Sequence, residues 1–229
     1  METTAWPGIH REGRDLYTVN LTPGVRVHGE ALRAVGGVEY RSWDPFRSKL
    51  AALLARGATV DFPSRPRAVL YLGGAHGTTV SHLSDMYPDA EVFVVEKSPT
   101  AFAPLLALSR RRSNLLPLLT DAQLPERYQA DVGEVDLLYQ DVAQRNQARI
   151  FAENARACLA PDGLGILMLK IRSVTQSRPA AVVAREARGI LVREGLQIRS
   201  ETPLSPFSRD HLGLTTTRSS PPPTVRREM

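Results

Sequence analysis

The sequence predicts an α/β fold in which a mostly parallel sheet is preceded by a small β-rich segment. From residue 67 onwards, short apolar stretches typical of buried strands alternate with stretches that have the apolar spacing of helices. Such alternation is typical of βαβ units, which build parallel sheets. The last two apolar stretches follow one another with no helical pattern between them, so we expect an antiparallel hairpin there.

Seven strands and four helices are predicted in this alternating part. The strands are expected at residues 68–72, 91–95, 115–119, 135–139, 163–169, 196–202 and 211–217. The helices are expected at residues 78–86, 99–112, 145–159 and 179–194. Pro99 stands in a first helical turn, where proline is tolerated, and Gly195 follows the last helix as a typical stop signal.

The first 45 residues lack helical periodicity and are predicted to be β-rich. Two β-type runs, 15–21 and 25–28, are separated by the turn sequence Thr22-Pro23-Gly24, and Gly36-Gly37 indicates another turn. A further helix is expected at residues 45–57, where leucines form an apolar stripe and a glycine ends the pattern.

Three segments therefore follow one another along the chain. We expect a small β-rich module at residues 1–45 and an α/β domain at residues 46–218. Residues 219–229 carry three consecutive prolines and no apolar pattern, so we expect them to be disordered.

Composition limits the class of protein. The chain has 229 residues, 42% hydrophobic and 23% charged, as in ordinary globular domains. The one cysteine, Cys158, excludes an intrachain disulfide and a cysteine-rich metal site, and the histidines are not spaced as metal ligands, so we expect no bound metal. Without a long apolar run or a secretory signal, we expect no membrane contact and a cytoplasmic, reducing location. The net charge of +5 is compatible with a polyanionic partner.

Glycines follow the first strand of the α/β part. Residues 70–79 read Leu-Tyr-Leu-Gly-Gly-Ala-His-Gly-Thr-Thr, and Glu96 closes the next strand, 19 residues after Gly77. Glycines let the backbone approach a ligand closely, and an acid at the tip of the second strand accepts hydrogen bonds from ribose hydroxyls. This layout predicts a nucleotide-type cofactor site. Its candidate residues are Gly73, Gly77, Thr78, Thr79 and Glu96.

Acidic residues end three successive strands of the predicted sheet. They are Glu96, Asp121 and Asp141, and Lys170 ends the next strand. Ligands of open α/β sheets bind at the carboxyl ends of the strands. Three acids there suit a ligand with a sulfonium, an amino group and ribose hydroxyls, namely S-adenosylmethionine, whereas a single acid is ordinary at an exposed strand end. The acids, and the lack of a complete Gly-x-Gly-x-x-Gly loop, disfavour a nicotinamide-dependent dehydrogenase.

A series of motifs resembles the fibrillarin family, the RNA 2′-O-methyltransferases of box C/D guide ribonucleoproteins, and most of all its archaeal members, the fibrillarin-like rRNA/tRNA 2′-O-methyltransferases. The matching stretches run in order from about residue 10 to 217; they are residues 40–52 and 77–85, Val95-Glu96 with Ser98-Pro99, residues 139–144 and 146–148, Lys170 with Arg172-Ser173, and Asp210-His211. The most distinctive is Tyr139-Gln140-Asp141-Val142-Ala143-Gln144. The resemblance implies a class I S-adenosylmethionine-dependent methyltransferase fold, Rossmann-like, with seven strands and an antiparallel last strand.

The resemblance also implies a catalytic tetrad of Lys49, Asp141, Lys170 and His211. A ribose 2′-hydroxyl is a poor acid and must lose its proton as it attacks the methyl carbon. Lys170 would accept that proton or stabilise the alkoxide. Asp141 would orient Lys170 and the hydroxyl, and Lys49 and His211 would hold the ribose or phosphate. Taken singly, each residue has an ordinary alternative, such as a solvated helix side chain or a helix cap.

Cofactor contacts and partners complete what the resemblance implies. S-adenosyl-L-methionine would contact Gly73, Gly77, Thr78, Thr79, Glu96, Lys97, Asp121, Ala122, Asp141 and Gln144. The partners would be box C/D guide RNA, target rRNA or tRNA, a Nop56/58-type scaffold protein and a kink-turn-binding ribosomal-type protein. The family usually has an aromatic residue where Lys97 stands and a small one where His76 stands. These two departures leave a second hypothesis open, a scaffold subunit with weak or no catalysis.

Overall fold

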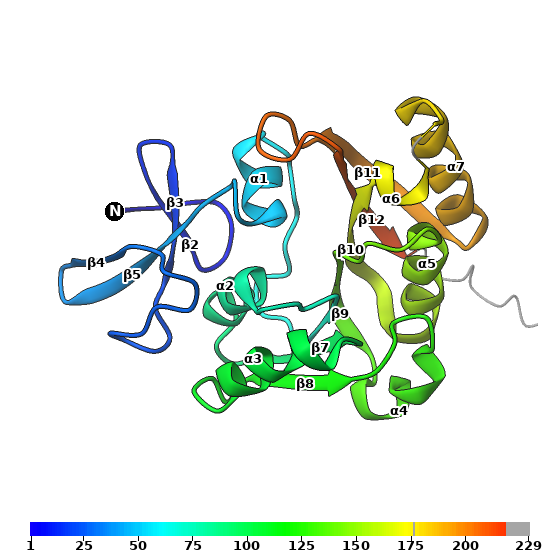
Figure 1. The fold of residues 1–229 in the computed structure, drawn as a ribbon. Coiled ribbons are helices and arrows are strands. Elements are labelled where there is room, and N and C mark those ends of the chain that lie inside the picture. The colour runs from blue at the N-terminus through cyan, green and yellow to red at the C-terminus, as the bar shows by residue number, and fades with distance from the viewer. Residues whose placement is uncertain (176, 219–229) are drawn as a thin grey trace, which may run out of the picture.

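Two sheets form the framework of the protein. The structure is a computed structural model that describes residues 1–175 and 177–218 (Figure 1). The smaller sheet has the strand order β1-β2-β3-β5-β4, and each neighbouring pair is antiparallel. Its strands are β1 (Glu2–Thr3), β2 (Ile9–Glu12), β3 (Asp15–Val19), β4 (Leu32–Val35) and β5 (Val38–Trp43).

The larger sheet has seven strands in the order β11-β12-β10-β9-β6-β7-β8. They are β6 (Ala68–Leu72), β7 (Glu91–Glu96), β8 (Leu115–Leu119), β9 (Val135–Gln140), β10 (Leu159–Lys170), β11 (Leu196–Pro203) and β12 (His211–Arg218). Five of them are mutually parallel, and β12 runs antiparallel between β10 and β11. The predicted mostly parallel sheet with a terminal antiparallel hairpin is therefore confirmed.

Helices cover both faces of this sheet. The longer ones are α1 (Lys49–Ala55), α2 (Thr78–Met86), α3 (Pro99–Ser109), α5 (Gln147–Cys158) and α7 (Ala180–Arg193). Three short ones are η1 (Pro125–Arg127), α4 (Gln129–Val132) and α6 (Ile171–Val174). Alternate strand residues supply two apolar cores: Tyr71 packs with α1, α2 and α3 on one face, and Leu70 packs with α5 and α7 on the other.

Most predicted elements lie within a few residues of their expected bounds, and β6, α2 and β8 match them. The helix expected from residue 45 begins only at Lys49, because the Ser48 hydroxyl caps its first turn by accepting from the Ala51 N–H. The strand expected at residues 25–28 is wrong. Those residues form a loop whose Val27 and His28 N–H groups donate to the Glu30 carboxylate. The predicted disordered segment, 219–229, lies outside the described residues.

A buried ionic cluster fastens the smaller sheet to α2. Asp85 of α2 accepts from Arg41 at 2.6 Å and from Arg112 at 2.5 Å, and all three side chains are almost completely buried. Its carboxylate also accepts from the Thr18 hydroxyl at 2.8 Å and the Leu21 N–H at 3.0 Å. Helix α2 is consequently buried between the two sheets. The two sheets are separate hydrogen-bonded units, and a domain boundary at residue 45 stays a prediction.

The strand order reverses between β6 and β9, which are adjacent and parallel. The crossover connections leave the sheet on opposite sides at such a point, which opens a crevice at the carboxyl ends of the strands. The segments after the two strands lie side by side, because the Asp141 N–H donates to the Leu72 carbonyl at 2.9 Å. In the part of the chain that is described, no helix has the length and apolar character needed to cross a membrane.

Candidate active site

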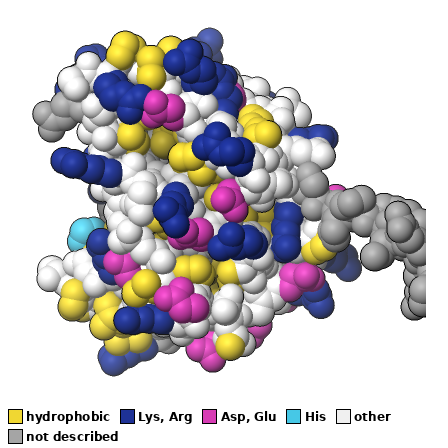
Figure 2. Space-filling view, turned by 90° about the vertical axis from the view of Figure 1, so that its right-hand side faces the viewer, with side chains coloured by type: hydrophobic (Ala, Val, Ile, Leu, Met, Phe, Trp, Pro, Cys, Tyr) yellow, Lys and Arg dark blue, Asp and Glu magenta, His cyan; other side chains and the backbone are white. Residues whose placement is uncertain are grey.

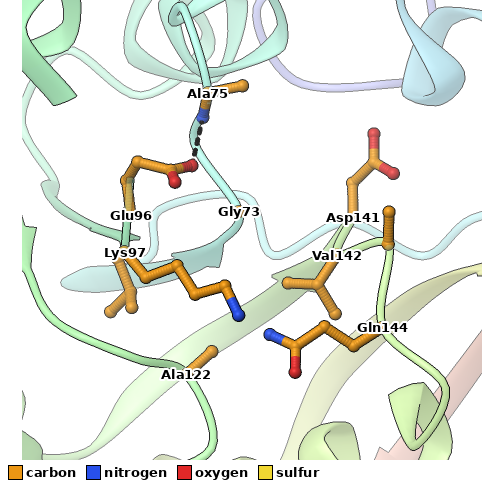
Figure 3. Close-up of a pocket in the computed structure, with 10 residues that line it drawn as sticks. Gly73, Ala75, Glu96, Lys97, Ala122, Asp141, Val142 and Gln144 are labelled. Atoms are coloured by element: carbon orange, nitrogen blue, oxygen red, sulfur yellow. Dashed lines mark hydrogen bonds between the residues drawn. The ribbon is translucent and has the colours of Figure 1, made fainter. Parts of the chain in front are cut away.

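A cavity of about 250 Å³ lies at this crevice (Figure 3). Six of the residues predicted to contact a cofactor line it: Gly73, Glu96, Lys97, Ala122, Asp141 and Gln144. They come from the segments that follow β6, β7, β8 and β9. The structure therefore brings together residues up to 71 positions apart in the sequence, as the strand-end argument anticipated.

Glycine is required at the floor of the cavity. Gly73 has a φ of +85°, which side-chain-bearing residues rarely adopt, and a Cβ atom there would lie 2.6 Å from the Asp141 carbonyl oxygen. The backbone of Gly73 is thereby held against the Asp141 segment. A ligand in the cavity meets bare backbone at this point.

The Glu96 carboxylate is fixed by two backbone N–H groups. Ala75 donates to one carboxylate oxygen at 2.9 Å, as the dashed line in Figure 3 marks, and Ser98 donates to the other at 2.8 Å. Each oxygen retains a lone pair. Glu96 is therefore an oriented acceptor for two neighbouring hydroxyl groups, which is what a ribose presents.

Lys97 and Asp121 form an ion pair at the same end of the cavity, with 3.7 Å between Nζ and the carboxylate. In Figure 3 the Lys97 side chain extends across the cavity toward Gln144. Partial burial alone would raise the pKa of Asp121, but the N–H of Gln123 and the charge of Lys97 lower it below its usual value. Asp121 is consequently a carboxylate at neutral pH.

Asp141 links the cavity to a cationic cluster. Its carboxylate lines the cavity and also accepts from Lys49 Nζ at 2.6 Å. Lys49 is the first residue of α1, whose capping Ser48 hydroxyl contacts the Thr79 hydroxyl at 3.0 Å. The lysine that contacts Asp141 is Lys49, which the fold brings to it from the start of α1, and the expected orientation of Lys170 by Asp141 stays a prediction.

Lys170 and His211 lie next to each other across the β10–β12 ladder, where they are register partners. The Lys170 ammonium donates no hydrogen bond to any residue within 1–175 or 177–218. His211 Nδ1 contacts the Ser208 hydroxyl at 2.7 Å, while its buried Nε2 is without a hydrogen-bond partner among the described residues. Burial, and next the charge of Lys49, lower the pKa of His211 to about 4, so the ring is neutral at neutral pH.

Four predicted contacts do not line the cavity. Asp121 forms an ion pair with Lys97, which does line it, and the Thr79 hydroxyl contacts the Ser48 hydroxyl. Gly77 caps α2 with a φ of +82°, and Thr78 begins that helix. Their roles stay predictions. Four lining residues were missed, Ala75, Val95, Val142 and Ala143. Val95, Val142 and Ala143 each adjoin a predicted residue and Ala75 lies two positions from one, but none carries a polar side chain that would indicate a site in the sequence.

The neutral state of His211 predicts acid sensitivity of the fold. Because its pKa is about 4 in the folded protein and about 6.5 in an unfolded chain, the unfolded state binds the proton first as pH falls. Stability should therefore decrease between pH 6.5 and 4. One full proton corresponds to about 1.4 kcal/mol per pH unit, and the half-buried ring should contribute less because solvent screens it.

Urea unfolding at pH 7.0 and pH 5.0 would measure this effect in the wild type and in His211→Gln. The wild type should lose more stability than the variant on acidification. His28 and His82, whose pKa values are also lowered by burial, are present in both proteins, so the difference isolates His211. Equal losses in the two proteins would contradict the expected pKa.

Comparison with known proteins places the chain in a family. A family model described as Fibrillarin matches residues 6–220. The Fibrillarin-like rRNA/tRNA 2′-O-methyltransferase of Methanothermobacter thermautotrophicus is 41% identical over 220 residues, covering 95% of this chain and 97% of the relative.

Two solved structures are similar along almost the whole chain. Aeropyrum pernix fibrillarin in complex with natively bound S-adenosyl-L-methionine has a TM-score of 0.85 and 38% identity, covering 94% of this chain and 96% of that one. Fibrillarin in a fibrillarin/Nop5p complex has a TM-score of 0.83 and 35% identity, covering 95% and 100%. The fold is that of the class I S-adenosylmethionine-dependent methyltransferases, with β12 as the antiparallel strand. The strand order, the match of the family model and the extent of these similarities together establish that this chain is a member of the fibrillarin family.

Proposed function

We propose that this protein transfers a methyl group from S-adenosyl-L-methionine to the 2′-oxygen of a ribose in rRNA or tRNA, directed by a box C/D guide RNA. The observation that carries the proposal is the position of Asp141. Its carboxylate lines the cofactor cavity and holds Lys49, while Lys170 ends β10 and His211 begins the neighbouring strand β12. The relatives are named rRNA/tRNA 2′-O-methyltransferases, which supports the same reaction.

The residues of the cavity fit this cofactor. Glu96 presents an oriented carboxylate to the ribose hydroxyls, and the bare backbone at Gly73 admits the methionine part beside Asp141. Asp121 does not line the cavity, but it is ion-paired with the lining residue Lys97 and would accept from the amino group of the base, and the apolar side chains of Ala122 and Val142 would provide packing surface for its ring. When bound, the cofactor supplies an electrophilic methyl group on a sulfonium.

The chain's own residues would prepare the nucleophile. The 2′-hydroxyl must lose its proton as its oxygen approaches the methyl carbon. No described residue accepts a hydrogen bond from Lys170 Nζ, so this group is available to the hydroxyl: as a neutral amine it would accept that proton, and as an ammonium it would stabilise the oxyanion. Asp141, which holds Lys49, would orient the hydroxyl by accepting its hydrogen bond before that proton is transferred. The uncharged ring of His211 would suit a ribose hydroxyl better than a phosphate.

Recognition of RNA is proposed to depend on partners. Figure 2 shows the face on which α5 and α7 lie, and basic and acidic side chains alternate across it. Pairs such as Arg149–Glu153 and Arg156–Glu194 neutralise one another there. Such a face is no continuous track for a phosphate backbone. Base pairing with a guide RNA would select the target, with a Nop56/58-type protein and a kink-turn-binding protein holding the assembly; the solved fibrillarin/Nop5p complex supports the first.

Methyl transfer by a reconstituted particle tests the proposal. With the chain, a Nop56/58-type protein, a kink-turn-binding protein and a guide RNA, labelled S-adenosyl-L-methionine should methylate only the ribose selected by the guide. Calorimetry with the isolated chain should detect cofactor binding, and Glu96→Gln should weaken it about tenfold, since a carboxylate accepting ribose hydroxyls is lost. Glu91→Gln, an exposed change at the other end of β7, is the matched control. Cofactor binding without methyl transfer would favour a scaffold subunit.

A further inference from the structure

Two buried side-chain amides of α5 bond to the backbone at two parts of the active site, one at Lys170 and one at the cofactor cavity. We propose that Gln147 and Asn154 are positioning residues, through which a single helix sets the place of Lys170 relative to the cofactor cavity. Neither residue lines the cavity. The inference rests on the function proposed above, because it assigns Lys170 to the chemistry and the cavity to the cofactor.

The side-chain amide of Gln147 bonds to both backbone groups of Lys170, the N–H and the carbonyl. The Lys170 N–H donates to Gln147 Oε1 at 2.8 Å, and Gln147 Nε2 donates to the Lys170 carbonyl at 3.0 Å. A primary amide that donates to and accepts from the same residue imitates a neighbouring strand. Gln147 is completely buried, so water does not compete for these bonds.

The sheet itself does not supply this support. The ladder between β10 and β9 ends at the pair Leu167–Gln140, three residues before Lys170. Both backbone groups of Lys170, its N–H and its carbonyl, bond to Gln147 rather than to β12. Without the amide, the N–H and the carbonyl of the half-buried Lys170 would lose their protein partner at the residue that carries the proposed base.

A second glutamine ties the same position to β9. Gln140 Nε2 donates to the Gln147 carbonyl at 2.8 Å, and Gln140 directly precedes Asp141. The chain of contacts therefore runs from the end of β9, through the first turn of α5, to the end of β10. It connects Asp141 and Lys170 without a direct contact between their side chains.

Asn154 bonds in a similar way to the backbone of a residue that lines the cavity. Its Nδ2 donates to the Ala122 carbonyl at 2.8 Å, and its Oδ1 accepts from the Tyr128 hydroxyl. Ala122 lines the cavity and directly follows Asp121. Asn154 is also completely buried, and it lies seven residues after Gln147, which is two helical turns and hence the same face of α5.

Replacing each amide by an apolar side chain of similar size separates the two roles. In Gln147→Met, kcat for methyl transfer by the particle should fall about 100-fold, as expected for a misplaced reacting group, with the dissociation constant for S-adenosyl-L-methionine unchanged. In Asn154→Leu, that dissociation constant should rise about tenfold, with kcat at saturating cofactor near the wild-type value. Each variant is the matched control of the other, because both remove a fully buried amide from one helix.

Loss of stability alone would affect both constants in both variants. If the two variants change the same constant, or if Gln147→Met keeps the wild-type kcat, the inference is wrong. Should either apolar variant fail to fold, Gln147→Asn and Asn154→Gln retain the amide with an altered reach and should show the same split, and its absence would overturn the inference. A wild-type particle that transfers no methyl group contradicts the proposed function instead, while calorimetry on Asn154→Leu still tests the cavity half.

Discussion

Replacing Lys170 by alanine is expected to lower kcat for methyl transfer by about 10²–10⁴-fold, the range that a positioned acid or base contributes. The cofactor dissociation constant should not change, because Lys170 does not line the cavity. The size of the effect follows from its surroundings. Lys49 is engaged by Asp141 at 2.6 Å, and His211 is neutral, so Lys170 is the remaining cationic group of the tetrad without a fixed partner in the described structure.

An arginine at this position distinguishes the two roles that a lysine can play. Lys170→Arg keeps the positive charge but cannot release a proton near neutral pH. If Lys170 accepts the proton, both variants should be similarly slow. If it stabilises the oxyanion by charge, the arginine variant should keep most of the activity. Full activity of Lys170→Ala would remove Lys170 from the chemistry altogether. Methyl incorporation under single-turnover conditions measures all three proteins without interference from product release.

Replacing Asp85 by asparagine is expected to destabilise the fold by about 3–5 kcal/mol, as is usual when one partner of a buried ion pair is removed. Asp85 neutralises Arg41 and Arg112, which are both almost completely buried. In the variant, the Glu30 carboxylate, 2.6 Å from Arg41, would be left to compensate two guanidinium groups. A loss of this size is a large part of the 5–15 kcal/mol by which natural domains are stable.

The neighbouring Asp89→Asn supplies the control, since Asp89 is exposed just beyond α2 and its replacement should change stability by no more than about 0.5 kcal/mol. Urea unfolding at pH 7 compares the two variants with the wild type. A loss below about 1 kcal/mol for Asp85→Asn would mean that the cluster is far less dry, or far more adaptable, than its geometry indicates.

Local patterns in the sequence were sufficient for the larger sheet. A fully buried strand such as β6 is a continuous apolar run, and α2 begins directly after a glycine loop, so their bounds can be recognised without tertiary information. The smaller sheet was harder, because its strands are short and pair antiparallel. The run at residues 25–28 has a strand-like composition, yet the Glu30 carboxylate ties it into a loop.

The candidate site was likewise predictable only in part. Residues at strand ends were found because parallel strands bring their carboxyl ends to one edge. Which side chain contacts which was not predictable, because Lys49 and Asp141 meet across 92 positions and their approach depends on how α1 packs. The positioning role of Gln147 was invisible for a similar reason, since it depends on where the β9–β10 ladder ends.

The lysine side chains of the protein all lie at the carboxyl ends of the strands of the larger sheet. The chain has three lysines, Lys49, Lys97 and Lys170, and every other basic side chain apart from the histidines is an arginine. Two of the three are held by Asp141 and Asp121, and the third ends β10 beside His211. Apart from the amino terminus, acylation or any other amine-directed modification of this protein is therefore confined to its active site. With the amino terminus blocked, an amine-reactive label on this molecule reacts only at that site, without any engineered tag.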